Sequence, residues 1–151
     1  MGLLGMSFVL VGCGASAAEW YEVSLGRPMP ASAAVRADVS NVFPLEGATG
    51  MVIDIDPSDA ELLVSRPTPL GPWHIGPVTG ETGGGMVPGV VGQLEELVDD
   101  PGLFDALDGD VLHIAAQERC CSSRDSLPWW NATVAVVDVE LGRVYIMTWD
   151  Y

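Results

Sequence analysis

Three carboxylates, those of Asp54, Asp56 and Asp59, lie within one short stretch of the sequence. Clustered oxygen ligands suit Ca²⁺, and the spacing begins like the loop of an EF-hand. Such a loop has Gly at its sixth position, where this chain has Asp59. Asp56 followed by Pro57 is also typical of a helix N-terminus, because the carboxylate can accept a hydrogen bond from a free N–H and Pro suits the first turn. We therefore expect a helix cap and no metal, with a calcium site as the alternative.

The chain has three cysteines, Cys13, Cys120 and Cys121. The adjacent pair could close a disulfide in an oxidising compartment, and the strain of such a ring would make the bond labile. Two free thiols are the first alternative. A metal site with His113 is the second, but a zinc site needs more ligands than the sequence offers nearby.

His74 and His113 are the two histidines of the chain. A nucleophile–base pair needs a Ser or Cys within about 3 Å of such a ring. The sequence contains no G-x-S-x-G motif. We therefore expect both histidines to be structural, and we predict neither catalytic residues nor a cofactor.

Aromatic residues give a candidate for ligand binding. Trp129 and Trp130 would point to opposite faces of a strand, and Trp73 stands beside His74 in a Pro/Gly-rich stretch. Together these four residues could form a platform for a sugar or a peptide. The alternative is that the tryptophans pack in the core.

The amino-terminal residues 1–12 are apolar and uncharged. The run is shorter than the roughly 20 residues that span a bilayer, and it matches the apolar part of a signal peptide. Leu10-Val11-Gly12-Cys13 resembles the bacterial lipobox, which implies acylation of the Cys13 thiol and cleavage just before it. Residues 1–12 are thus expected to be a lipoprotein signal peptide and residues 13–19 a flexible tether. No basic residue precedes Cys13, which an upstream start would explain. In the alternative, residues 7–12 form a buried strand and Cys13 is a core thiol.

Composition limits the partners. The chain has 151 residues, 48% of them hydrophobic, which fits a single globular domain over residues 20–151. The chain has 21 acidic and six basic side chains, which gives a net charge of −15. Nucleic acids and anionic lipid surfaces need basic patches, so neither is an expected partner of the folded surface. The charge suits solubility, cation binding or a basic partner protein, and the alternative is the compositional bias of a high-GC genome.

Hydrophobic patterning predicts the order of elements. Strands are expected at residues 20–25, 49–55 and 110–117, and a C-terminal β-hairpin at 129–140 and 143–150. Residues 33–43 fit either a helical stripe or a strand, and we expect a strand there. Helices are expected from Pro57 to about Ser65 and at residues 90–98. Asp100-Pro101 is expected to cap a further short helix that buries Leu103, Phe104 and Leu107. Residues 66–89 read as a Pro/Gly-rich loop. This order predicts an α+β fold, in which two or three short helices cover one face of an antiparallel sheet.

Pro30-Ala31-Ser32-Ala33, two expected strands and an Asp-Pro helix follow the lipobox. This arrangement resembles a group of small lipoproteins of high-GC bacteria, many of unknown function. The resemblance covers residues 10–65 and implies no catalytic residues.

We therefore expect an exported, non-enzymatic binding domain in the cell envelope, anchored to the membrane through lipid on Cys13. Its partner would be a basic protein or a small extracellular ligand. One alternative is an exported hydrolase that uses a His in a loop-built cleft. Another is an acidic immunity or inhibitor protein for a basic partner.

Overall fold

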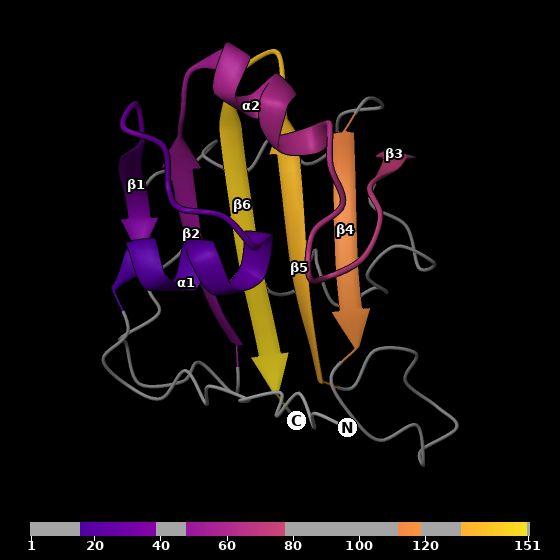
Figure 1. The fold of residues 1–151 in the computed structure, drawn as a ribbon. Coiled ribbons are helices and arrows are strands. Elements are labelled where there is room, and N and C mark those ends of the chain that lie inside the picture. The colour runs from indigo at the N-terminus through magenta and orange to yellow at the C-terminus, as the bar shows by residue number, and fades with distance from the viewer. Residues whose placement is uncertain (1–15, 39–47, 78–111, 119–130, 151) are drawn as a thin grey trace, which may run out of the picture.

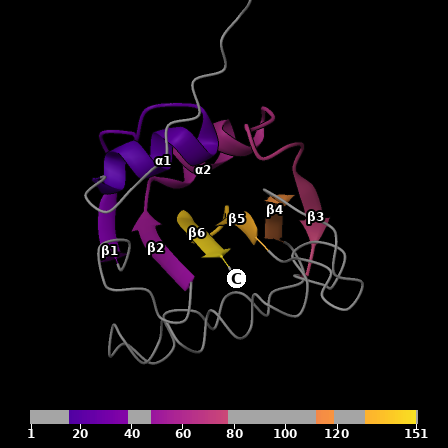
Figure 2. The same cartoon turned by 90° about the horizontal axis from the view of Figure 1, so that it is seen from below.

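A computed structural model of the chain describes residues 16–38, 48–77, 112–118 and 131–150. Within them, six strands form one antiparallel sheet, and two helices lie on the same face of it (Figures 1 and 2). The predicted α+β class with an antiparallel sheet is confirmed. The helices expected at 90–98 and after Asp100-Pro101 lie outside the described residues. The elements are α1 (Ala17–Leu25), β1 (Ala34–Asp38), β2 (Ala48–Asp54), α2 (Pro57–Val64), β3 (His74–Gly76), β4 (Leu112–Glu118), β5 (Asn131–Asp138) and β6 (Arg143–Asp150).

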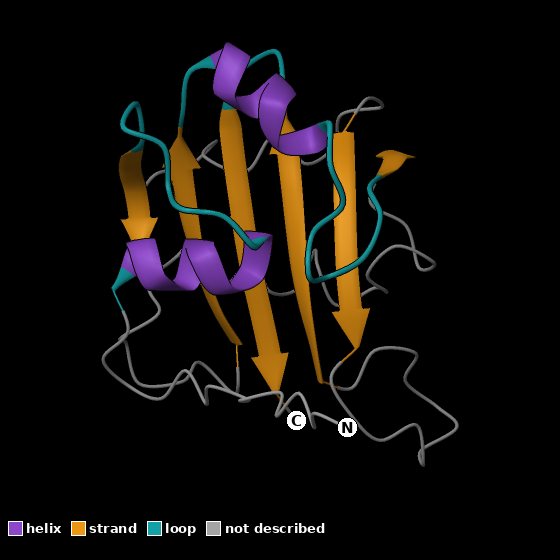
Figure 3. Cartoon of the chain, in the orientation of Figure 1, coloured by secondary structure: helices purple, strands orange, loops and turns teal. Residues whose placement is uncertain are grey.

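The sheet contains strands from the amino-terminal and the carboxy-terminal parts of the described chain. Its strand order is β1-β2-β6-β5-β4-β3, and every neighbouring pair is antiparallel. β5 and β6, which fall within the arms predicted at 129–140 and 143–150, pair with each other, and β2 pairs along the other side of β6 from Ala48 opposite Trp149 to Asp54 opposite Arg143. β2 therefore lies beside the C-terminal strand β6, far away in sequence, and β1 forms the edge of the sheet next to β2 (Figure 3).

Both faces of the sheet are apolar and buried. Alternation along β2 and β6 turns Met51, Ile53 and Ile146 towards the helices, where they belong to the main core cluster. The intervening Val52 and Tyr145 lie on the second face, and they are also at most 1% exposed. An uninterrupted apolar run such as residues 134–137 is typical of a strand that is buried on both sides. Burial is thus not limited to the face that the helices cover.

The strand predicted for residues 20–25 is wrong, because this stretch belongs to α1. A capping box starts the helix: the Ser16 side chain accepts from the Glu19 N–H at 3.3 Å, and the Glu19 carboxylate accepts from the Ser16 N–H at 2.7 Å. These hydrogen bonds lower the pKa of Glu19. Trp20, Tyr21, Ser24 and Leu25 are buried, which is the stripe of an amphipathic helix.

The start of α1 also corrects the predicted tether. Ala17 is the first helical residue, so residues 17–19, expected to be flexible, are part of a capped helix. The helix ends at Gly26, whose left-handed conformation (φ 72°) is the common glycine C-cap. None of the helices in the described ranges is long and apolar enough to cross a membrane.

The expected helix after Asp56 is confirmed, but Asp56 does not cap it with its side chain. Instead, the Ser32 hydroxyl accepts a hydrogen bond from the Asp56 N–H at 3.2 Å and donates one to the Asp59 carboxylate at 2.5 Å. In a capping box the side chain at the third helical position bonds the N-cap N–H directly. Asp59 holds that position, and its side chain is one methylene shorter than Glu. The hydroxyl of Ser32 therefore bridges the two groups.

Ser32→Ala is expected to lower the free energy of unfolding by about 1 kcal/mol, the usual cost of losing a capping interaction. The change removes both hydrogen bonds that attach the segment before β1 to the start of α2. Urea unfolding would measure the loss. Ser58→Ala is the matched control, because Ser58 is exposed in the same helical turn. Equal effects of the two substitutions would contradict the bridging role.

Candidate functional site

The structure describes six of the residues that the sequence singled out, namely Asp54, Asp56, Asp59, Trp73, His74 and His113. The lipidation, disulfide and remaining aromatic predictions fall outside the described residues; they concern Cys13, Cys120, Cys121, Trp129 and Trp130.

The three aspartates do not form a calcium site. Asp54 ends β2 on the face of the sheet away from the helices, whereas Asp59 lies on α2 and is bonded to Ser32. In the described ranges, no group of three or more His, Cys, Asp or Glu side chains could hold a metal ion. The calcium alternative is wrong because the chain passes from strand to helix between Asp54 and Pro57, which separates carboxylates that are close in sequence.

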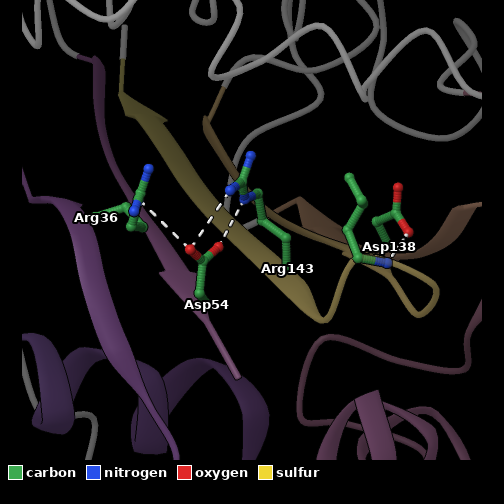
Figure 4. Close-up of polar contacts among 5 residues, drawn as sticks. Arg36, Asp54, Asp138 and Arg143 are labelled. Atoms are coloured by element: carbon green, nitrogen blue, oxygen red, sulfur yellow. Dashed lines mark hydrogen bonds and ion pairs between the residues drawn. The ribbon is translucent and has the colours of Figure 1, made fainter. Parts of the chain in front are cut away.

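Asp54 instead lies in a row of charges that crosses four strands. Its carboxylate accepts from Arg143 Nε at 2.7 Å and from Arg143 Nη2 at 3.4 Å, and Arg36 Nε lies 3.4 Å away (Figure 4). On the other side of Arg143, Asp138 is its direct cross-strand neighbour. The row reads Arg36, Asp54, Arg143, Asp138 over β1, β2, β6 and β5.

The charges of this row alternate in sign, so we interpret the row as stabilising the sheet and not as a binding site. The hydrogen bond to Asp54 raises the pKa of Arg143 and so holds its positive charge. Each charge has a neighbour of opposite sign, so the row balances its own charge and offers no excess cation for an anionic ligand. The Asp54–Arg143 pair holds opposite residues of β2 and β6 together, and Arg36 links β1 to this pair, whereas the Asp138 carboxylate accepts from the Leu141 N–H at 2.9 Å.

Trp73 and His74 lie side by side in sequence but have different surroundings. The indole N–H of Trp73 donates to the Arg66 carbonyl at 2.8 Å, and the half-buried ring packs against the core cluster. His74 is exposed and begins β3, a short strand that the sequence did not predict within residues 66–89. Trp73 thus has the core-packing role that was the alternative to a ligand platform.

The two histidines lie on opposite faces of the sheet. His74 is paired with Ile114, and His113 with Ile75 in the neighbouring position. His113 shares a face with Ala115, which belongs to the core under the helices. Its Nδ1 is buried and has no hydrogen-bond partner in the described structure. A catalytic base is normally oriented by a hydrogen bond to its second ring nitrogen, so His113 lacks that feature of a nucleophile–base pair.

The edge formed by β3 and β4 is the described surface where predicted binding residues meet an exposed apolar side chain. Ile75 is 69% exposed and lies directly opposite His113, with His74 and Trp73 preceding it in the chain. This edge can offer apolar contact and an imidazole to a ligand. Its three-residue strand limits pairing with a strand of another chain.

Burial lowers the pKa of His113 below its usual value of 6.5, and a pH prediction follows. The unfolded chain binds the proton more readily than the folded chain, so this residue's contribution to stability is present above about pH 6.5 and is lost as the pH falls. Between pH 7.5 and 5.5, the unfolding free energy of the natural protein should therefore fall more than that of His113→Asn. His74→Asn is the matched control for removing an imidazole. Parallel curves for the natural protein and His113→Asn would contradict the prediction.

The roles of several residues that stabilise the fold were not predicted from the sequence. The Ser16–Glu19 pair has the S-x-x-E signature of a capping box, which could have identified α1. Ser32 carries no local signal, because its partners are in α2. Arg36 and Arg143 likewise acquire their role only through strand pairing.

Comparisons of this chain with protein families, with curated proteins and with solved structures find no match.

Proposed function

We propose that the chain is a lipid-anchored, non-enzymatic binding domain of the bacterial cell envelope. The observation that carries the proposal is the apolar, uncharged run of residues 1–12, which ends in Leu10-Val11-Gly12 directly before Cys13. The first described element, α1, begins at Ala17, so that cleavage before Cys13 would remove no part of a described helix or strand. Anchoring and an intact fold are therefore compatible.

The surroundings of the ionisable side chains support binding rather than catalysis. Asp54 and Arg143 neutralise each other between two strands, and Asp59 is bonded to Ser32 at the start of α2. Among the residues that the structure describes, none bonds the buried Nδ1 of His113. In this proposal the β3–β4 edge around Ile75 contacts a small extracellular ligand, and a basic protein remains the other partner class for a chain of net charge −15.

Metabolic labelling with a palmitate analogue tests the anchor. The full chain, expressed in a bacterium that processes lipoproteins, should incorporate the label and fractionate with membranes. Cys13→Ala should abolish the label, because it removes the thiol to which the lipid would be attached. Cys120→Ala is the matched control and should label like the natural protein. Equal labelling of the natural protein and Cys13→Ala would refute lipidation at Cys13.

A further inference from the structure

The start of α1 sets the number of residues between the described domain and a lipid on Cys13. Ser16 and Glu19, joined by reciprocal hydrogen bonds, put the first described residue three positions after Cys13. Three residues span at most about 11 Å. A tether extending to residue 19, as the sequence predicted, would have reached about 25 Å. The capped helix thus removes more than half of the expected reach.

The helix itself is firmly attached to the domain. Trp20, Tyr21 and Leu25 are at most 7% exposed beneath it, and burial raises the pKa of Tyr21 to about 12. Beyond the C-cap, Arg27 donates to the Leu62 carbonyl at 3.2 Å and so links the end of α1 to α2. The position of α1 therefore determines the position of the whole described sheet.

We propose that α1 is the membrane-proximal element of the anchored protein, with its amino-terminal end held within about 11 Å of the lipid headgroups. This inference rests on the proposed function, because it requires a lipid on Cys13. The domain is then held close to the bilayer in a restricted range of orientations. The turn of residues 139–142 and α2 lie together at one end of the sheet, and α1 lies farther from that turn (Figure 1).

Charge opposes direct adsorption of this end to an anionic bilayer. Glu19 and Glu22 are exposed on α1, and the helix has no basic residue in its last turn. The separation of about 11 Å is close to the Debye length at physiological salt, about 8 Å, so these carboxylates are only partly screened from anionic headgroups. The short link therefore keeps α1 near the membrane surface, and charge keeps it from adsorbing to that surface.

Distance-dependent quenching on vesicles tests the proposal. In the full chain with Cys120→Ser and Cys121→Ser, Cys13 is the one thiol, and a maleimide phospholipid in phosphatidylcholine vesicles would couple to it. An encoded fluorescent amino acid is placed at position 18, exposed on α1, or at position 141, which is 58% exposed in the β5–β6 turn. A quencher attached to lipid headgroups should quench the probe at 18 severalfold more than the probe at 141.

A lengthened link provides the matched variant. Ten Gly and Ser residues inserted between Ala15 and Ser16 add a root-mean-square reach of about 18 Å and leave the capping box intact. This insertion should lower quenching at position 18 towards the value at 141. Equal quenching at the two positions, no effect of the insertion, or failure of Cys13 to couple would overturn the inference. If cells do not label Cys13 with palmitate but the quenching ratio on vesicles is as expected, the proposed function fails and the inference fails with it, whereas labelling in cells with equal quenching at the two positions overturns the inference alone.

Discussion

Gly142→Ala is expected to lower the free energy of unfolding by about 3 kcal/mol or more, through backbone strain combined with a steric clash. Gly142 has φ 64°, a left-handed conformation that costs other residues about 1–2 kcal/mol. A Cβ at this position would lie 2.2 Å from the Ile55 carbonyl oxygen and 3.2 Å from the Pro57 nitrogen. Both are backbone atoms, which cannot move away as the end of a flexible side chain can.

The clash would act where the β5–β6 turn meets the start of α2. The Ile55 N–H donates to the Gly142 carbonyl at 2.7 Å, directly between the end of β2 and the first turn of the helix. A methyl group on Gly142 would push these segments apart and weaken that hydrogen bond. The substitution would therefore disturb both the turn and the packing of α2 on the sheet.

Urea unfolding of Gly142→Ala and Gly71→Ala would separate the two causes. Gly71 also has a positive φ, 122°, but a Cβ there would meet nothing within 4 Å. Gly71→Ala should therefore show the cost of backbone strain without the clash, about 1–3 kcal/mol. Similar losses in the two variants would mean that the close approach of Gly142 to Ile55 contributes nothing to the effect.

The fold was predictable where local sequence and burial agree. β2, β4, β5 and β6 are rich in β-branched and apolar residues, and Asp56-Pro57 marks the start of α2. Residues 20–25 were predicted as a strand because polar and apolar residues alternate there. The same residues also fit an amphipathic helix, because Trp20, Tyr21, Ser24 and Leu25 lie on one side of it. The Ser16–Glu19 capping box favours that helix.

The surroundings of the candidate residues were less predictable, because they depend on which strands become neighbours. Asp54 and Arg143 are 89 residues apart and meet only in the order β1-β2-β6-β5. Local spacing grouped Asp54 with Asp59, although the sheet places them on different sides. The opposite faces of His74 and His113 likewise follow from the register of β3 on β4.

Asp54→Asn should destabilise the protein by about 2 kcal/mol, since it removes the carboxylate that faces Arg143 and leaves a partly buried guanidinium without its counter-charge. The Arg143 side chain is 20% exposed and that of Asp54 is 31% exposed, so solvent screens the pair only in part. The substitution preserves the size of the side chain, so the loss reports mainly on charge. Urea unfolding at neutral pH would measure it.

Arg36 provides the matched comparison within the same row. Its side chain is 50% exposed and its Nε lies 3.4 Å from the Asp54 carboxylate, whereas Arg143 Nε lies at 2.7 Å and a second nitrogen also bonds Asp54. Exposed pairs of this kind contribute about 0.5 kcal/mol, so Arg36→Ala should have a small effect. In double-mutant cycles, the coupling of Asp54 with Arg143 should exceed its coupling with Arg36 by about 1 kcal/mol. Equal coupling energies would contradict this prediction. They would show that neither the burial of Arg143 nor its two hydrogen bonds to Asp54 strengthens the contact between β2 and β6.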